Sequence, residues 1–185
     1  PQVLRVTKKN TNKSKNIEPP KKCPVCGGET YKEKNEAVLR CINTYGCYAQ
    51  KISQIIHFIS KKALNIDGFG EKQVKQFYDL KIISNIVDIF LLEKNKNIIE
   101  SLEGWGSLSF TNLISSIDKS KTINLDKFIY SLGIRFIGET NAEILAKEFK
   151  NIDKFVSLSD KSSALANIDG LGPKAISSII EYFSH

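Results

Sequence analysis

The feature that most constrains this chain is a cluster of cysteines. The 185 residues include four cysteines, and all fall within one short stretch, at Cys23, Cys26, Cys41 and Cys47. Two residues separate the first pair, and two glycines follow it, which allows a tight turn. The fourteen residues before the third cysteine are enough for a short β-hairpin. These spacings predict a zinc site with four thiolate ligands.

Two other interpretations of the cysteines stay open from spacing alone. Four cysteines could form two disulfides, but Cys23 and Cys26 are a poor geometric pair, and a lysine-rich chain without a preceding apolar signal segment is typical of a reducing compartment. A thioredoxin-type redox pair would need a βαβ setting and no second pair. A catalytic zinc normally keeps an open coordination position, whereas four cysteines fill it, so we expect structural zinc.

The positive charge of the chain is concentrated at its start. The formal net charge is +7, but residues 1–22 hold seven of the 27 basic residues and one of the 20 acidic ones, which leaves the other 163 residues at +1. We therefore expect any polyanion to be bound through local placement of donors. The sequence contains no apolar run of membrane-spanning length, so no membrane partner is expected.

The chain divides into an opening segment, a metal module and a helical part. Residues 1–6 suggest the end of a strand, and the polar stretch 7–16 a linker. A hairpin is expected between Tyr31 and Cys41, and an amphipathic helix over 50–64. His57 on that helix is interpreted as a surface or boundary residue in preference to a fifth metal ligand.

The helical part contains a repeat. A glycine, one apolar residue and a second glycine stand before three expected helices, over 71–80, 107–118 and 173–183, and a degenerate copy stands before a fourth over 139–150. The second glycines, at 70, 106, 138 and 172, recur at separations of 36, 32 and 34 residues. Such a period fits two helices and their connections.

Each repeat has the composition of an anion-binding hairpin. Its glycines permit positive φ and close approach of a ligand, and its central apolar residue (Phe69, Trp105, Ile137, Leu171) is expected to fill the core between the helices. We interpret Trp105 as such a core residue in preference to a base-stacking platform. Unsatisfied N–H groups at the following helix start suit a phosphate, and such contacts carry no sequence information. The candidate DNA contacts are Gly68, Gly70, Lys72, Gly104, Gly106, Gly138, Thr140, Gly170, Gly172 and Lys174.

These features together resemble the bacterial NAD-dependent DNA ligases. The resemblance rests on the Cys-Pro-Val-Cys-Gly motif, on Leu39 to Asn43 and Cys47 to Gln50, and on the hairpins at 66–72 and 132–140. It implies a mainly α fold: a small four-cysteine zinc finger with a short β-hairpin, then an all-α domain of four helix-hairpin-helix motifs. Position 136 is commonly histidine in the family, and this chain has Phe136.

The resemblance also implies a domain organisation and a function for the parent enzyme. Residues 1–22 would be the end of an oligonucleotide-binding domain and a basic linker, 23–50 the zinc finger, and 51–185 the duplex-binding domain. The parent enzyme would seal nicks in replication and repair, using NAD and Mg²⁺ in other domains of the same chain. This sequence has no Lys-x-Asp-Gly adenylation motif, so we expect it to be inactive alone. A cytoplasmic, nucleoid-associated bacterial location is expected.

Two alternatives remain for the function. One is a non-enzymatic DNA-structure binder or repair accessory built on the same repeats. The other is a protein-interaction scaffold, in which zinc finger and helices only stabilise each other. We prefer DNA binding because scaffold turns do not require glycines on both sides of a buried apolar residue at each helix start.

Overall fold

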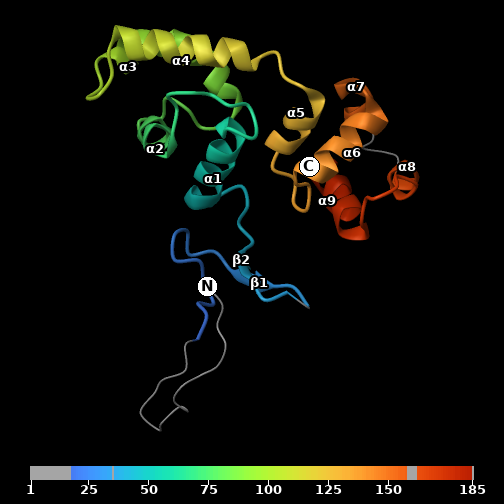
Figure 1. Cartoon of the computed structure of the whole chain (residues 1–185). Coiled ribbons are helices and arrows are strands. Elements are labelled where there is room, and N and C mark those ends of the chain that lie inside the picture. Colours follow the sequence, from blue (N-terminus) through green and yellow to red (C-terminus); the bar gives the residue numbers. More distant parts are fainter. Residues whose placement is uncertain (1–17, 35, 158–161, 185) are drawn as a thin grey trace, which may run out of the picture. The chain divides into compact units, whose positions relative to one another are not determined.

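The structure, a computed structural model, describes residues 18–34, 36–157 and 162–184 and falls into two compact units. Unit 1 comprises Pro1–Tyr48 and unit 2 Ala49–His185. The strand expected over 1–6 and the linker over 7–16 lie outside the described residues. Figure 1 shows the strands in blue and the helices in colours from teal to red.

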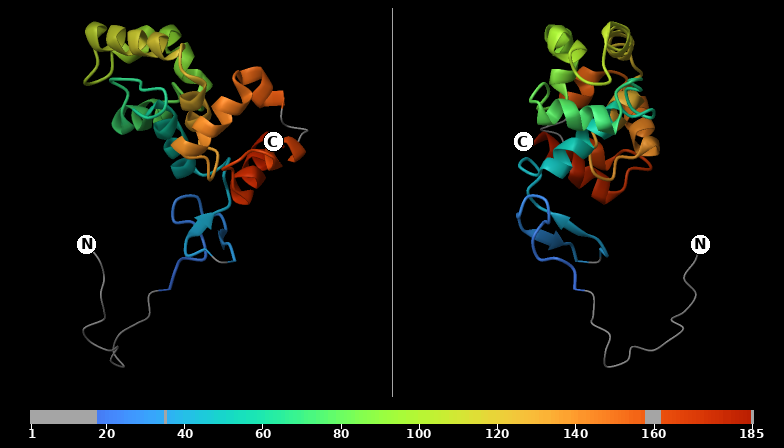
Figure 2. Two further views of the ribbon diagram at one scale, coloured as in Figure 1. Left: turned by 45° about the vertical axis from the view of Figure 1, so that its right-hand side comes forward. Right: turned by 90° about the vertical axis from the view of Figure 1, so that its left-hand side faces the viewer.

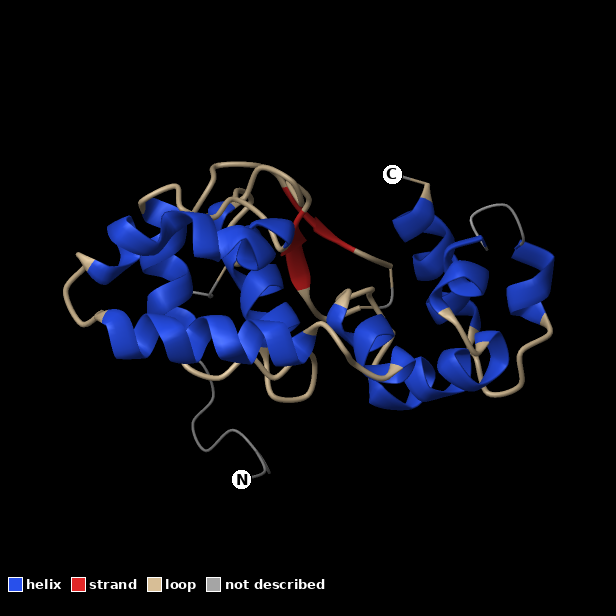
Figure 3. Ribbon diagram, turned by 90° about the horizontal axis from the view of Figure 1, so that it is seen from above, coloured by secondary structure: helices blue, strands red, loops and turns tan. Residues whose placement is uncertain are grey.

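Unit 1 is built on one antiparallel hairpin. Strand β1 (Thr30–Lys32) pairs with β2 (Leu39–Cys41), with Thr30 opposite Cys41 and Lys32 opposite Leu39. These two strands are the red arrows of Figure 3. The hairpin expected between Tyr31 and Cys41 is confirmed, and its register brings the third cysteine to the end of β2 that adjoins the start of β1.

The secondary-structure elements in the described part of unit 2 are all helices. Its elements, in chain order, are α1 (Tyr48–Ile59, whose first residue belongs to unit 1), α2 (Glu71–Asp79), the 3₁₀-helix η1 (Val87–Asn95), α3 (Lys96–Glu100), α4 (Ser107–Ser120), α5 (Leu125–Ser131), α6 (Glu139–Phe149), α7 (Ile152–Val156), α8 (Ser162–Ala166) and α9 (Pro173–Phe183). None of the helices in the described ranges is long and apolar enough to cross a membrane. The expected fold class, a small zinc-finger hairpin followed by an all-α domain, is confirmed.

Two hydrophobic cores organise unit 2. The first is contributed by α1 to α4 and contains Phe77 and Leu92, both fully buried. The second is contributed by α5 to α9 and contains Leu145 and Phe155, also fully buried. The two views of Figure 2 show these sets as the teal-to-yellow and the orange-to-red helices. Each core thus underlies two of the four hairpins found in the sequence.

Helix α1 differs from the helix expected over 50–64. It begins at Tyr48 and ends at Ile59, because the chain folds back there: the Leu64 N–H donates to the Phe58 carbonyl at 3.1 Å, and the Ile66 N–H to the Ile59 carbonyl at 3.1 Å. Leu64 is buried in this turn. The apolar side chain of Leu64 continues the helical spacing in the sequence, which is why the sequence predicts a helix that reaches residue 64. In the structure this side chain is buried by the turn and not by a longer helix.

Candidate metal centre and nucleic-acid interface

The four cysteine sulfurs of unit 1 lie together. The Sγ atoms of Cys23, Cys26, Cys41 and Cys47 all fall within 4.8 Å of one another, and those of Cys26 and Cys41 are 3.5 Å apart. Four thiolates around Zn²⁺ at about 2.3 Å place neighbouring sulfurs about 3.8 Å apart. All four thiols are free, which argues against the disulfide interpretation. The donor set therefore fits a four-coordinate structural zinc site.

Backbone geometry holds the first two ligands. The Gly27 N–H donates to the Cys23 carbonyl at 2.9 Å, the Cys23 N–H donates to the Gly28 carbonyl at 2.8 Å, and Gly27 has φ of 69°. The Cys26 and Val25 amides, which donate to the Cys23 sulfur, lower its pKa from 9.0 to about 7. Such amides stabilise a thiolate, the form in which cysteine binds a metal.

In the second pair, Cys41 is partly buried and Cys47 is buried, and a turn lies between them. Desolvation raises the pKa of Cys41 to about 11, against the opposing effect of the Asn43 amide. Asn43 also organises the turn before Cys47: its Oδ1 accepts from the Gly46 N–H at 3.0 Å and its carbonyl from the Cys47 N–H at 3.0 Å. A Cβ at Gly46 would lie 2.5 Å from Asn43 Oδ1. Sequence reasoning did not single out Gly46, although its place one residue before a ligand was a usable signal.

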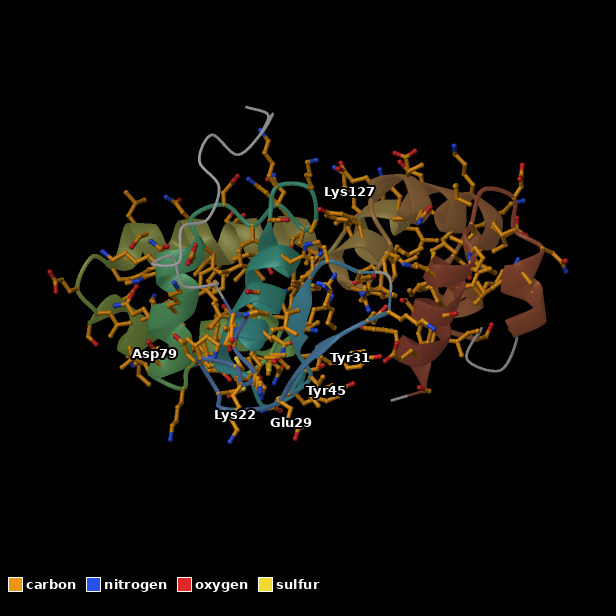
Figure 4. The ribbon with its side chains drawn as sticks, turned by 90° about the horizontal axis from the view of Figure 1, so that it is seen from below. Lys22, Glu29, Tyr31, Tyr45, Asp79 and Lys127 are labelled. Carbon is orange, nitrogen blue, oxygen red and sulfur yellow. The ribbon has the colours of Figure 1, made fainter. Side chains whose placement is uncertain are left out.

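Aromatic and charged side chains occupy the surface of unit 1. Tyr31 is 58% exposed and Tyr45 70% exposed. Figure 4 labels both, together with Lys22 and Glu29, and shows all four coming from the blue ribbon of this unit. Lys22 and Glu29 pair by an isolated backbone bridge beside the hairpin. These side chains do not contribute metal ligands.

The hairpins of unit 2 share one turn geometry. In the second, third and fourth, the N–H of the central apolar residue donates to the carbonyl three positions earlier: Trp105 to Leu102 at 3.0 Å, Ile137 to Ile134 at 3.0 Å, and Leu171 to Ile168 at 3.3 Å. Positive φ at the third residue of such a turn favours glycine. Gly68, Gly104 and Gly170 have φ of 78°, 81° and 81°, but the third hairpin has Phe136 there, with φ of 62°.

The apolar residue of each hairpin enters a core, as the sequence predicts. Phe69, Ile137 and Leu171 are buried. Trp105 packs against the first core, its ring centroid 5.0 Å from that of Phe77. Its Nε1 donates to Gln76 Oε1 at 3.3 Å. This packing supports the interpretation of Trp105 as a core residue.

The second glycine of each hairpin is the N-cap of the next helix. Gly70, Gly106, Gly138 and Gly172 precede α2, α4, α6 and α9, all in extended conformations. In the described structure no side chain caps α2, α6 or α9. At α4 the Ser109 hydroxyl accepts from the Gly106 N–H at 2.9 Å, a cap that sequence reasoning missed. The first-turn amides of these helices form an anion-binding geometry.

Charged side chains near the helix starts are placed unequally. Lys72 and Lys174, each two residues past an N-cap glycine, are exposed, as is Thr140 of the third hairpin. The equivalent residue of α4 is Leu108, which is 76% exposed. The carboxylate at the start of α2, Glu71, is bound by Lys75 at 2.6 Å.

The third hairpin is tied to the segment after α1. Glu139, the first residue of α6, is bound by Lys62 at 2.6 Å, and this partner raises the pKa of Lys62. His57 Nε2 lies 2.7 Å from the Tyr130 carbonyl. The histidine interpreted as a boundary residue thus contacts α5, a long-range partner that local sequence could not identify, and it lies outside the cysteine cluster.

Both units resemble known protein families. Residues 22–49 match the model of the NAD-dependent DNA ligase C4 zinc finger domain, and residues 127–185 match that of the helix-hairpin-helix motif. A DNA ligase of Pelagibacter ubique is 46% identical over 99% of the chain and 28% of the relative's length. DNA ligases of Wolbachia pipientis and Rickettsia prowazekii are 42% and 39% identical, over 89% and 99% of the chain and 26% and 28% of their own lengths.

The chain thus spans little more than a quarter of the length of the curated relatives it matches. The match to the ligase zinc finger includes all four clustered cysteines, and the match to the helix-hairpin-helix motif includes the third and fourth hairpins. The relatives named here extend the similarity across both units. The chain therefore belongs to the family of NAD-dependent DNA ligases, as the segment that holds the zinc finger and the helix-hairpin-helix repeats.

Proposed function

We propose that this chain binds nicked duplex DNA without sequence preference, as the zinc-finger and helix-hairpin-helix part of an NAD-dependent DNA ligase that seals nicks in replication and repair. The observation that carries the proposal is the repetition of one exposed structure. Four hairpins each pack an apolar residue against a core and present an N-cap glycine and a helix start. The ligase relatives support this proposal over a non-enzymatic accessory module.

Each hairpin offers a phosphate the same three features. Its first-turn N–H groups can donate to phosphate oxygens, the helix dipole adds partial positive charge, and the glycine N-cap leaves room for close approach. A Cβ built at Gly106, Gly138 or Gly172 would meet no atom within 4 Å, so the space in front of these helices is open. Lys72 and Lys174 add full charges at the first and fourth hairpins.

The candidate contacts are the hairpin residues singled out in the sequence. They are Gly68, Gly70, Lys72, Gly104, Gly106, Gly138, Thr140, Gly170, Gly172 and Lys174. Backbone contacts of this kind fix the register of a duplex without reading bases. NAD and Mg²⁺ would act in other domains of the parent chain, at the nucleoid in the bacterial cytoplasm.

The zinc finger has a supporting role in this proposal. With four thiolates bound, the metal supplies no open coordination position for catalysis. It would instead fix residues 23–50 as a rigid module between the end of an oligonucleotide-binding domain, with the linker over 1–22, and the hairpin domain over 51–185. Cys23, Cys26, Cys41 and Cys47 would hold it.

A competition experiment tests the preference for nicks. A labelled duplex with one central nick is bound by the chain at low salt, then displaced by unlabelled nicked duplex, intact duplex of the same sequence, or the single strand. We expect nicked duplex to compete best and single strand least. Equal competition by all three would refute duplex recognition. Competition by intact duplex that equals or exceeds that by nicked duplex would refute the nick as the preferred substrate.

A further inference from the structure

Phe136 occupies a backbone position that the other hairpins give to glycine. It is the third residue of the turn from Ile134 to Ile137 and has φ of 62°, against 78° to 81° at Gly68, Gly104 and Gly170. A side chain is sterically disfavoured in this region, most of all a bulky one. A residue held there against its preference calls for a compensating role.

Core packing does not supply that role. Phe136 is 38% exposed, and it does not belong to the second hydrophobic core, which includes its neighbours Ile134 and Ile137. Its backbone is held by Asn141, whose Nδ2 donates to the Phe136 carbonyl at 2.8 Å. The backbone of Phe136 is therefore fixed at the tip of the hairpin, and the residue stays partly exposed to solvent.

Two cations from two hairpins flank this ring. The Arg135 guanidinium carbon lies 4.5 Å from the ring centroid, and Lys174 Nζ lies 5.3 Å from it. Lys174 stands in the first turn of α9, at the fourth hairpin. Such cation–π contacts bring the third and fourth hairpins together around one aromatic surface.

We propose that Phe136 is an aromatic contact to duplex DNA, packing on deoxyribose at the edge of the minor groove while Arg135 and Lys174 meet the flanking phosphates. The inference rests on the proposed function and deepens it. A minor groove presents apolar sugar walls between two lines of phosphates, and an apolar ring between two cations matches that pattern. The glycines of the other hairpins offer backbone only, so the third hairpin would grip the duplex differently.

Replacing Phe136 with glycine separates binding from folding. Phe136→Gly removes the ring and also relieves the positive φ, so we expect the melting temperature to be unchanged or raised. We expect the affinity for a nicked duplex to fall five- to tenfold, while the slope of log affinity against log salt stays the same, because no charge is lost. Arg135→Gln and Lys174→Gln should instead reduce that slope by about one each.

Two further variants complete the test. Leu80→Ala removes another exposed apolar side chain, at the end of α2 opposite its hairpin, and should bind like the unaltered chain. Phe136→Asn, a residue that tolerates positive φ, gives a second measurement should the glycine variant lose stability.

The outcomes separate this inference from the proposed function. Binding by Phe136→Gly and Phe136→Asn within twofold of the unaltered chain would overturn the inference and leave duplex binding intact. A loss accompanied by a reduced salt slope would also overturn it, since the ring would then only hold the cations. Failure of the unaltered chain to bind any duplex would overturn the proposed function itself.

Discussion

At the scale of single residues, the two glycines of a hairpin differ in backbone conformation and therefore in the reason for having no side chain. Gly170 has φ of 81°, so its lack of a side chain serves the backbone of the turn. Gly172 has φ of −73° and ψ of 157°, a conformation open to any residue, and a Cβ there would meet nothing within 4 Å. The fold therefore does not require a glycine at position 172, which fits the proposal that this residue leaves room for a phosphate.

Gly172→Val should weaken duplex binding without unfolding the protein. A valine side chain would occupy the open space in front of α9, and we expect the affinity to fall about tenfold, or about 1.4 kcal/mol. Because only backbone contacts are lost, sequence preference should stay flat. Fluorescence titration with duplexes of unrelated sequence measures both, and Gly70→Val, at the first hairpin, should behave alike.

The matched variant Gly170→Val should lose stability, whereas Gly172→Val should lose affinity for DNA and stay folded. Its φ is positive and its Cβ would lie 3.1 Å from Ile144 Cδ1, so we expect a loss of stability of about 1–3 kcal/mol. Thermal melting distinguishes the pair. A large loss of stability in Gly172→Val would contradict the assignment of that glycine to ligand approach.

At the scale of elements, the sequence predicts what is locally encoded. The zinc hairpin follows from cysteine spacing, and α9 begins at Pro173 and ends at Phe183 as expected, because proline at the first helical position and a glycine N-cap fix its start. The end of α1 at Ile59 could not be predicted, since Leu64 continues the apolar pattern although it is buried by a turn.

The candidate site follows the same division. Cysteine and glycine motifs are local signals and could be found in the sequence. The contact between Phe136 and Lys174 and the hydrogen bond between His57 and Tyr130 depend on segments far apart in the chain. No local pattern encodes such contacts.

Removal of zinc should unfold the module around the cysteines and leave the helices of unit 2 folded. Structural zinc contributes about 10–16 kcal/mol of apparent binding free energy in small modules, far more than a three-residue hairpin can supply. After complete chelation we expect the amide protection of Ile42 and Cys47 against hydrogen exchange to be lost. The circular dichroism spectrum of the chain should lose the contribution of a folded segment over 23–50 and keep that of the helices of unit 2. Unchanged spectra after metal removal would contradict a structural zinc.

Phe77→Ala should destabilise one core more than the other. Phe77 is fully buried in the first core, so we expect a loss of about 3–5 kcal/mol. Hydrogen exchange should accelerate more in 52–117 than in 129–179, because separate cores can open as separate units. Phe155→Ala, in the second core, is the control and should show the reverse pattern.

At the scale of the whole molecule, the net charge of +7 is concentrated in residues 1–22, and the rest of the chain is nearly neutral. Outside residues 1–22 the net charge is +1, so under the proposed function this part of the chain would bind DNA through cations placed at the hairpins. Lys72→Gln and Lys174→Gln should each lower the salt slope of binding by about one. Lys150→Gln removes the same charge from the end of α6 opposite its hairpin, and its slope should match that of the unaltered chain.

The most direct test of the account is the affinity of the 185-residue chain for nicked duplexes of two unrelated sequences, measured by titration across a series of salt concentrations. Four hairpins that hold the sugar-phosphate backbone predict equal affinities for the two sequences and a parallel decline as salt rises. A mismatched base pair costs a sequence-specific protein about 1 kcal/mol or more, and a tenfold difference in affinity corresponds to about 1.4 kcal/mol. A preference of more than about tenfold for one of the two sequences would therefore indicate base readout and contradict backbone binding. Absence of binding to either duplex at low salt would contradict it as well.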